Sequence, residues 1–164
     1  MPHQSYEESY VGHLRSLIGK EKIIIIATRA VVFDNKGQLL LIRRRDNKRW
    51  AMPAGAMELG ESINECLFRE VQEESGLDVN AATLFAIWSD PKKTSIVTHY
   101  GDPYQLIVFV FRVDEWSGEL VSQTDETVDS GFFPLDALPE IAPHYHETLE
   151  DLGIFETKGQ LILK

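Results

Sequence analysis

The segment from Ile63 to Ser75 constrains the fold of this chain more than any other, because both of its ends carry helix-terminating signals. Ser62 and Glu65 have the spacing of a capping box, in which each side chain bonds the backbone amide of the other residue. Gly76 supplies the left-handed residue that commonly ends a helix. We therefore expect a helix over these residues.

The packing face of this helix carries negative charge. With Ile63 at zero on a helical wheel, Leu67 and Val71 fall at about 40° and 80° and define an apolar face. Three carboxylates continue that side at about −20°, −80° and 20°, namely Glu70, Glu73 and Glu74. Like charges at this spacing repel each other, and their partial burial is unfavourable unless a cation neutralises them. The pattern favours a site for Mg²⁺, with Mn²⁺ as a substitute, over a solvated acidic patch.

The rest of the chain combines strand patterns with a few helical ones. Apolar runs at Ile23–Phe33 and Gln38–Arg43 flank the turn residues Asp34–Gly37, which predicts a hairpin. Further strands are expected at residues 82–89, 105–113, 119–121, 131–133 and 160–163, the last as a strand or a tail. Helices are expected at residues 5–18 and 143–152, with a short helix starting at Leu135. This mixture predicts an α/β (α+β) layered domain rather than a helical bundle.

We divide the chain into an N-terminal helix at residues 1–20, appended to a domain at residues 21–164. The alternatives for that helix are packing on the domain and a contact in a homodimer.

Composition and charge narrow the range of partners. The formal net charge of −10 disfavours binding to a nucleic-acid duplex, because an acidic surface repels the phosphate backbone. The single cysteine, Cys66, excludes an internal disulfide and fits a cytoplasmic protein. The apolar run that starts at Ile23 is too short to span a membrane.

The residues around the acidic helix resemble the Nudix box. The pattern consists of a glycine, a glutamate, and then Arg-Glu-apolar-any-Glu-Glu-any-Gly-apolar, and the chain matches it from Gly55 through Glu61 and Arg69 to Leu77. The flanking segments at Leu39–Arg43 and Gly131–Leu135 extend the resemblance over about residues 22 to 150. One departure is Ala54, which stands where many Nudix boxes have a first glycine.

The resemblance implies a fold, a metal site and a reaction. The fold would be an α/β/α sandwich with a mixed β-sheet and a loop–helix–loop catalytic motif. The carboxylates of Glu70, Glu73 and Glu74 and the carbonyl of Gly55 would bind the metal. Arg69 would orient these carboxylates, and Glu61 would hold Arg69. The alternative for the last two residues is an ordinary surface ion pair.

Residues outside the box are also candidates for the site. Nudix enzymes often place an acidic residue before the final strand, and Asp125 and Glu126 resemble it. Glu126 would be a base or an extra ligand, and Asp125 a substrate contact; the alternative is a polar loop. Arg43 and Arg45 would contact phosphate, unless they belong to a solvated basic loop. Trp50 would stack on a nucleobase, unless it is a packing residue.

The expected activity is metal-dependent hydrolysis of a phosphoanhydride bond in a small nucleotide-like molecule. The substrate would be a nucleoside diphosphate linked to another moiety, or a nucleoside triphosphate. Glu73 is the first choice as the base that accepts the proton of the attacking water. Pro91 weakly favours ADP-ribose-like substrates, and the segment His99–Tyr104 is expected to turn over the pocket. The alternative is a non-catalytic module on the same fold that senses a nucleotide or ADP-ribose.

Overall fold

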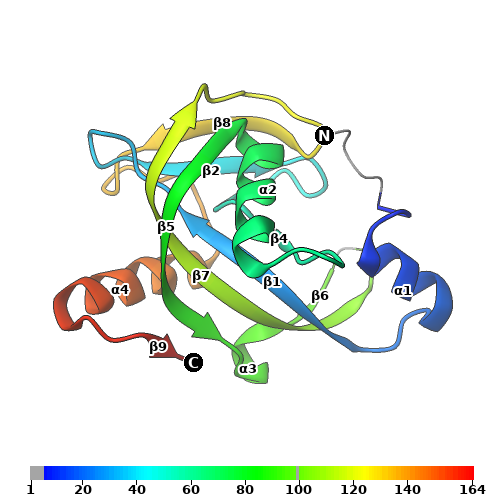
Figure 1. Cartoon of the computed structure of the whole chain (residues 1–164). Coiled ribbons are helices and arrows are strands. Elements are labelled where there is room, and N and C mark those ends of the chain that lie inside the picture. The colour runs from blue at the N-terminus through cyan, green and yellow to red at the C-terminus, as the bar shows by residue number, and fades with distance from the viewer. Residues whose placement is uncertain (1–5, 99) are drawn as a thin grey trace.

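The computed structural model describes residues 6–98 and 100–164, whose strands form two sheets (Figure 1). The larger sheet has the order β4-β1-β7-β5-β9, and β6 also pairs with β7. Its strands are β1 (Ile23–Val31), β4 (Ala54–Ala56), β5 (Leu77–Trp88), β6 (Ser95–Val97), β7 (Pro103–Gly118) and β9 (Ile162–Leu163). The sheet is mixed, because β1 runs parallel to β7 and β9 parallel to β5, whereas the other neighbours are antiparallel.

The smaller sheet has the order β3-β2-β8. It consists of β2 (Leu39–Arg44), β3 (Trp50–Ala51) and β8 (Thr127–Phe133). The predicted hairpin between residues 23–33 and 38–43 is therefore wrong beyond its turn. Phe33 forms an isolated bridge with Leu39, after which β1 and β2 separate into different sheets, because each finds its long partner strand elsewhere in the chain.

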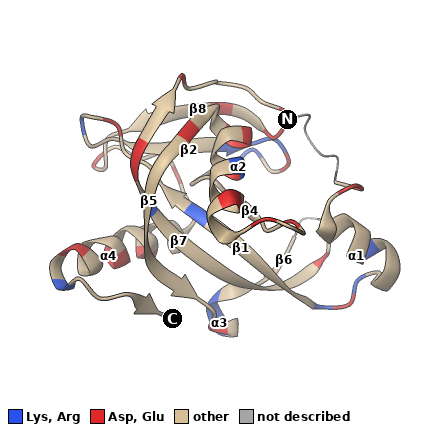
Figure 2. Cartoon of the chain, in the orientation of Figure 1, with Lys and Arg blue, Asp and Glu red and all other residues tan. Residues whose placement is uncertain are grey.

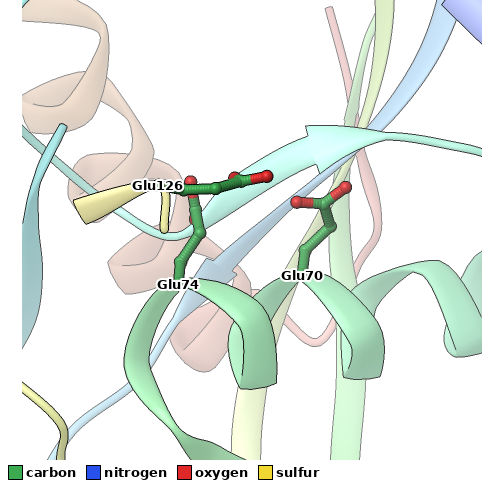
Figure 3. Close-up of side chains that lie close together, drawn as sticks. All are labelled: Glu70, Glu74 and Glu126. Atoms are coloured by element: carbon green, nitrogen blue, oxygen red, sulfur yellow. The ribbon is translucent and has the colours of Figure 1, made fainter. Parts of the chain in front are cut away.

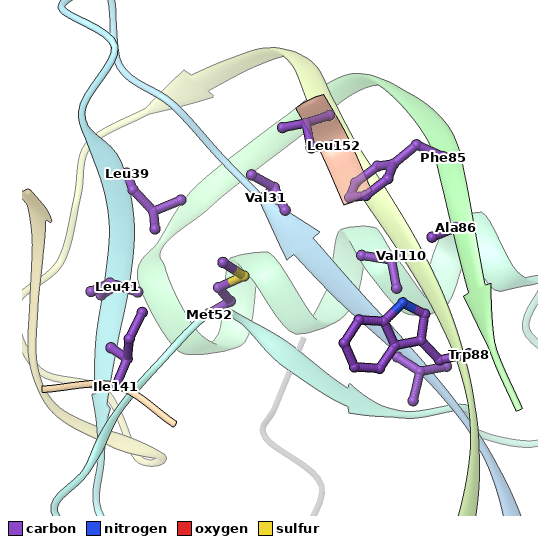
Figure 4. Packing of buried hydrophobic residues seen from close by; sticks show 11 residues of the cluster. Val31, Leu39, Leu41, Met52, Phe85, Ala86, Trp88, Val110, Ile141 and Leu152 are labelled. Carbon is purple, nitrogen blue, oxygen red and sulfur yellow. The ribbon is translucent and has the colours of Figure 1, made fainter. Parts of the chain in front are cut away.

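The helices are α1 (Tyr10–Ile18), α2 (Ile63–Ser75), α3 (Pro91–Thr94) and α4 (Pro143–Lys158). Alternate residues of β1 pack on opposite faces of the larger sheet. Ala30 of β1 and Val32, just after the strand, share a buried cluster with Leu67 and Val71 of α2. Val31 belongs to a second cluster with Trp88 and Leu152 (Figure 4). Because Leu152 lies on α4, the two helices cover opposite faces, and the expected α/β/α sandwich with a mixed sheet is confirmed.

Several element boundaries differ from the predicted ones. Strand β5 begins at Leu77, directly after the helix, and β7 continues to Gly118, so residues 119–121 form no strand of their own. Leu135 lies in a turn closed by a hydrogen bond from Ala137 N to Pro134 O (3.0 Å), and not in a helix. Residue 5 of the predicted N-terminal helix lies outside the described residues.

Helix α1 packs on the domain. The backbone N–H of Tyr10 donates to Glu58 Oε2 (2.7 Å), and Arg15 Nη2 donates to Pro103 O (2.8 Å). Val11 is buried in a small cluster with Ile25. The homodimer contact stays a prediction. Among the described residues, no helix combines the length and the apolar character needed to cross a bilayer.

Candidate active site

Helix α2 directs two carboxylates into the protein. The predicted capping box is present, since Ser62 Oγ accepts from Glu65 N (3.3 Å) and Glu65 Oε2 accepts from Ser62 N (2.7 Å). Gly76 ends the helix in the left-handed conformation, at φ 78°. Glu70 and Glu74 are 7% and 2% exposed, so the expected inward orientation is confirmed for both. Such burial of charged groups is rare in the absence of compensation.

A third carboxylate joins them from the loop that precedes β8. One carboxylate oxygen from each of Glu70, Glu74 and Glu126 lies within 4.8 Å of the others. Figure 3 shows the two helix side chains rising from α2 toward the Glu126 side chain above them. The backbone of this loop is tied to the basic strand end, because Arg45 N donates to Glu126 O (2.8 Å).

Burial and mutual repulsion make these carboxylates unusually weak acids. The pKa of Glu70 is raised to about 7, chiefly by burial; Arg69 opposes the rise, and the negative charges of Glu126 and Glu73 contribute to it. Burial also raises the pKa of Glu74 well above its ordinary value, with repulsion from Glu70 as the next cause. A cation bound among these oxygens would remove both causes of the instability.

Arg69 connects the helix to the preceding loop. Its Nε and Nη2 donate to the two oxygens of Glu61 (3.0 and 2.7 Å), and its Nη1 donates to Glu70 Oε1 (2.7 Å) and Glu73 Oε2 (3.1 Å). Glu61 in turn accepts from Glu58 N (2.7 Å). These contacts are the arrangement that the resemblance implied, in which Glu61 holds Arg69 and Arg69 orients the neighbouring carboxylates.

Residue 55 must be glycine because the chain packs closely there, and not because of its backbone angles. A Cβ atom at this position would lie 1.9 Å from Glu70 Cδ, so any side chain would displace the carboxylate. The neighbouring Ala54 N–H donates to Glu74 Oε2 (2.9 Å). Strand β4 therefore positions both buried carboxylates, one by leaving space and one by a hydrogen bond.

The donor set fits a hard divalent cation. It consists of oxygen atoms, which suit Mg²⁺ and Mn²⁺ better than softer metals. The nearby Cys66 thiol is buried, which raises its pKa to about 12, so it stays protonated. Glu70, Glu74 and Glu126 are the residues that the structure brings together. Glu73 lines the same cavity but is held by Arg69 outside the three-carboxylate cluster.

The carboxylates border a cavity of about 940 Å³ that runs along the strands toward α4. Its lining is mixed in charge, and it includes Arg29 and Arg44 as well as the acidic residues of α2. Figure 2 shows acidic residues on α2 and a basic band on β1 near β4. A cavity of this volume accommodates a ligand of nucleotide size.

The four predicted substrate contacts are not among the residues that line this cavity, and three of them make other contacts. Arg43 Nε donates to Lys48 O (2.9 Å). The Arg45 guanidinium donates to the backbone carbonyls of residues 124, 125 and 127, so Arg45 holds the loop of Glu126, while Asp125 is exposed there. Trp50 packs edge-on against Phe133, with ring centroids 4.9 Å apart, which is the packing alternative.

Other cavity residues were not singled out from the sequence. Arg44 lies 3.9 Å from Glu74 through its Nη1, and Trp88, His144 and Tyr145 line the far side. Among them, Arg29 could have been recognised as a candidate from the sequence, because a charged residue in an apolar strand needs compensation when it is buried. The others come from segments distant in sequence, and only the fold brings them together.

The predicted segment His99–Tyr104 also reaches the cavity. Tyr100, Asp102 and Tyr104 are among its lining residues, whereas His99 lies outside the described residues. Pro91 begins the short helix α3 and does not line the cavity.

Comparison with known proteins agrees with this fold. The model of the NUDIX domain matches residues 24–152. An ADP-ribose pyrophosphatase of Methanocaldococcus jannaschii is 31% identical over 124 residues, which are 73% of this chain and 68% of that protein. The chain therefore belongs to the NUDIX family, and the expectation of a Nudix pyrophosphohydrolase is confirmed.

Further similar proteins include two more ADP-ribose pyrophosphatases, one of them putative, and a MutT protein. A putative ADP-ribose pyrophosphatase of Bacillus subtilis is 32% identical over 117 residues, which are 70% of this chain but 52% of that protein. The structure of an ADP-ribose pyrophosphatase from Streptococcus suis has a TM-score of 0.62 at 27% identity and covers 85% of this chain and 97% of its own. The MutT protein of Methanosarcina mazei has a TM-score of 0.65 at 23% identity, with 84% and 98% covered, which shows the shared fold.

Proposed function

We propose that this protein hydrolyses a phosphoanhydride bond in a small nucleotide-like molecule, with Mg²⁺ or Mn²⁺ bound by Glu70, Glu74 and Glu126. The observation that carries the proposal is the convergence of these three carboxylates, two of them buried, at the edge of a cavity of about 940 Å³. The carbonyl of Gly55 is a further candidate ligand, because its residue contacts Glu70.

The residues around the proposed metal site have separate roles. A divalent cation, when bound, neutralises phosphate oxygens and lowers the barrier to attack by water. Arg69 keeps Glu70 in place through a 2.7 Å hydrogen bond, and Glu61 keeps Arg69 in place through two. Arg44, near Glu74, adds positive charge on the cavity wall, where it offsets the negative charge of an incoming phosphate.

Two carboxylates are candidates for the base. The sequence favours Glu73, and its side chain faces the cavity while bound to Arg69. The geometry favours Glu126, because it meets Glu70 and Glu74 directly. Replacing the residue that acts as the base by glutamine should lower kcat at least about 10²-fold. Glu73→Gln and Glu126→Gln are compared at metal concentrations that saturate each variant, and the role is assigned to the variant whose kcat still falls by that factor.

For the substrate, we favour a nucleoside diphosphate joined to a sugar, as in ADP-ribose. The support is the printed activity of the archaeal, Bacillus and Streptococcus relatives. Nucleoside triphosphates are the second class, because the sequence leaves the substrate open between these two.

The test is turnover of a defined panel. The purified chain is incubated with Mg²⁺ or Mn²⁺ and with ADP-ribose, sugar nucleotides, nucleoside triphosphates and dinucleoside polyphosphates, and products are separated by ion-exchange chromatography. Water enriched in ¹⁸O shows which phosphorus is attacked. The absence of turnover with every compound, for a folded protein, would contradict the proposal. Metal-dependent binding of ADP-ribose without turnover would support the sensing module instead.

A further inference from the structure

Arg29 on β1 is a buried cation on the wall of the cavity that the α2 carboxylates also line. Its side chain is 92% shielded, since Arg29 is 8% exposed. The guanidinium carbon lies 4.9 Å from the ring centroid of Trp88 and 5.1 Å from that of Tyr145. Both rings stabilise the positive charge through cation–π contacts, and they also fix the plane in which the guanidinium is held.

The hydrogen-bonding capacity of Arg29 is only partly used within the described part of the protein. Its Nη1 donates to Thr148 Oγ1 (2.8 Å), but its buried Nε has no hydrogen-bond partner among the described residues. The nearest acid, Asp151, is already engaged, because it accepts from Trp88 Nε1 (3.0 Å) and pairs with Lys164 Nζ (2.7 Å). Burying a guanidinium with an unused donor is costly, so its retention points to a ligand that completes the site.

The position of Arg29 relates it to the carboxylate cluster. In the pairing of β1 with β4, Arg29 lies opposite Ala54, whose N–H donates to Glu74. Strand β4 therefore connects the two sites, and both border one cavity. A ligand that spans them would place an anionic group on Arg29.

The neighbours of Arg29 limit the kind of ligand. Trp88 and Tyr145 are in contact with the guanidinium, so these ring faces are not available for stacking on a nucleobase. His144 lies beside them on the cavity wall, and burial together with the charge of Arg29 lowers its pKa to about 4. A neutral imidazole can donate one hydrogen bond to an oxyanion. These features fit a phosphate group better than an aromatic ring.

We propose that Arg29, held between Trp88 and Tyr145, binds a phosphate group of the ligand through its guanidinium. A guanidinium offers donors in a fixed planar arrangement that suits recognition of a phosphate. In so far as this phosphate belongs to the substrate, the proposal rests on the proposed function. The proposal adds an anion-binding subsite at Arg29, separate from the metal-binding carboxylates. This subsite would select ligands that place one phosphate on Arg29 while they also reach the carboxylates.

The experiment measures binding without catalysis. Isothermal titration calorimetry in EDTA compares adenosine 5′-monophosphate with adenosine, and ribose 5-phosphate with ribose, so that each pair isolates the contribution of the phosphate. We expect the phosphorylated member of at least one pair to bind about 10- to 100-fold more tightly. The pair that shows the preference identifies which side of the substrate reaches Arg29.

Arg29→Met should abolish that preference. Arg29→Lys should keep only part of it, because lysine retains the charge but not the planar arrangement of donors. The matched control is Arg112→Met, which removes another strand arginine that reaches α4 but that pairs with Asp114 and Glu156 outside the cavity; it should leave the preference intact. Thermal unfolding shows which variants are folded, and Arg29→Lys serves if Arg29→Met is not.

Two outcomes would overturn the inference: equal binding of both members of each pair by the wild type, or an unchanged preference in the Arg29 variants. Neither outcome depends on turnover. A chain that binds phosphate through Arg29 but hydrolyses nothing in the panel would contradict the proposed function alone. A chain that hydrolyses ADP-ribose with its phosphate preference unaffected by Arg29→Met would contradict this inference alone.

Discussion

Replacing Glu70 by glutamine should stabilise the metal-free protein and weaken its response to metal. Glu70 has its pKa raised from 4.5 to about 7, which corresponds to roughly 3 kcal/mol in favour of the protonated form. Between these two pH values the folded protein retains a proton that the unfolded chain has lost. The stability of the metal-free wild type therefore falls as the pH rises through this window, and the loss is complete above about pH 7.

Glutamine keeps the size of the side chain but carries no charge. At pH 8 in EDTA, we expect Glu70→Gln to be more stable than the wild type by roughly 3 kcal/mol, or about 6–10 °C in Tm for a chain of this length. Arg69 keeps its bonds to Glu61 and Glu73 in the variant, which limits the loss on that side. At pH 4 the two proteins should unfold at nearly the same temperature.

Metal should narrow the difference between the two proteins. Saturating Mg²⁺ at about 100 times its dissociation constant adds roughly 2.7 kcal/mol to the stability of a protein that binds it only when folded, and the variant should gain less. The assay is thermal unfolding followed by circular dichroism at pH 4, 6 and 8, with EDTA or Mg²⁺. The control is Glu150→Gln, which removes an exposed carboxylate from α4. A Glu70→Gln protein that is no more stable than the wild type at pH 8 in EDTA would refute the reasoning.

Three further predictions concern the surroundings of the cluster. Gly55→Ala should lose metal affinity and about 1–3 kcal/mol of stability, because the added Cβ would overlap the Glu70 carboxylate; metal titration and chemical unfolding test this, and wild-type affinity would contradict it. Arg69→Lys should reduce metal affinity or kcat about 10- to 100-fold, because lysine cannot make the two bonds to Glu61; steady-state kinetics across metal concentrations would show it, and an unchanged rate would reduce the pair to a surface contact. Cys66 should resist iodoacetamide at pH 8 in the folded protein and react in denaturant, because its thiol is buried and its pKa is raised to about 12; mass spectrometry detects the adduct, and rapid labelling of the native chain would be inconsistent with the structure.

Local patterns in the sequence predicted the acidic helix well. Its capping box, its glycine stop and the inward angles of Glu70 and Glu74 are all properties of neighbouring residues, so they can be read without the fold. The predicted hairpin was wrong because strand pairing depends on residues that are distant in the sequence. Strands β1 and β2 are joined by a tight turn, but their partners, β7 and β8, lie far along the chain, and only the assembled core decides between them.

The substrate side of the cavity was predicted poorly for the same reason. Clustering of Arg43 and Arg45 in the sequence suggested a phosphate contact, yet strand alternation sends Arg44, between them, toward Glu74. Arg29 sits alone in an apolar strand, and the rings that surround it come from β5 and α4. A position can carry a signal of burial in the sequence, but the identity of its neighbours depends on long-range packing.

The origin of Glu126 has a mechanical consequence. Glu70 and Glu74 belong to the helix on the larger sheet, whereas Glu126 directly precedes β8 of the smaller sheet. Besides the hydrogen bond from Thr127 Oγ1 to Glu74 O (3.2 Å), a shared ion would fasten the two sheets together at this point. Amide hydrogen exchange in β8 should then slow when Mg²⁺ replaces EDTA, while exchange in β9, at the far edge of the larger sheet, stays unchanged.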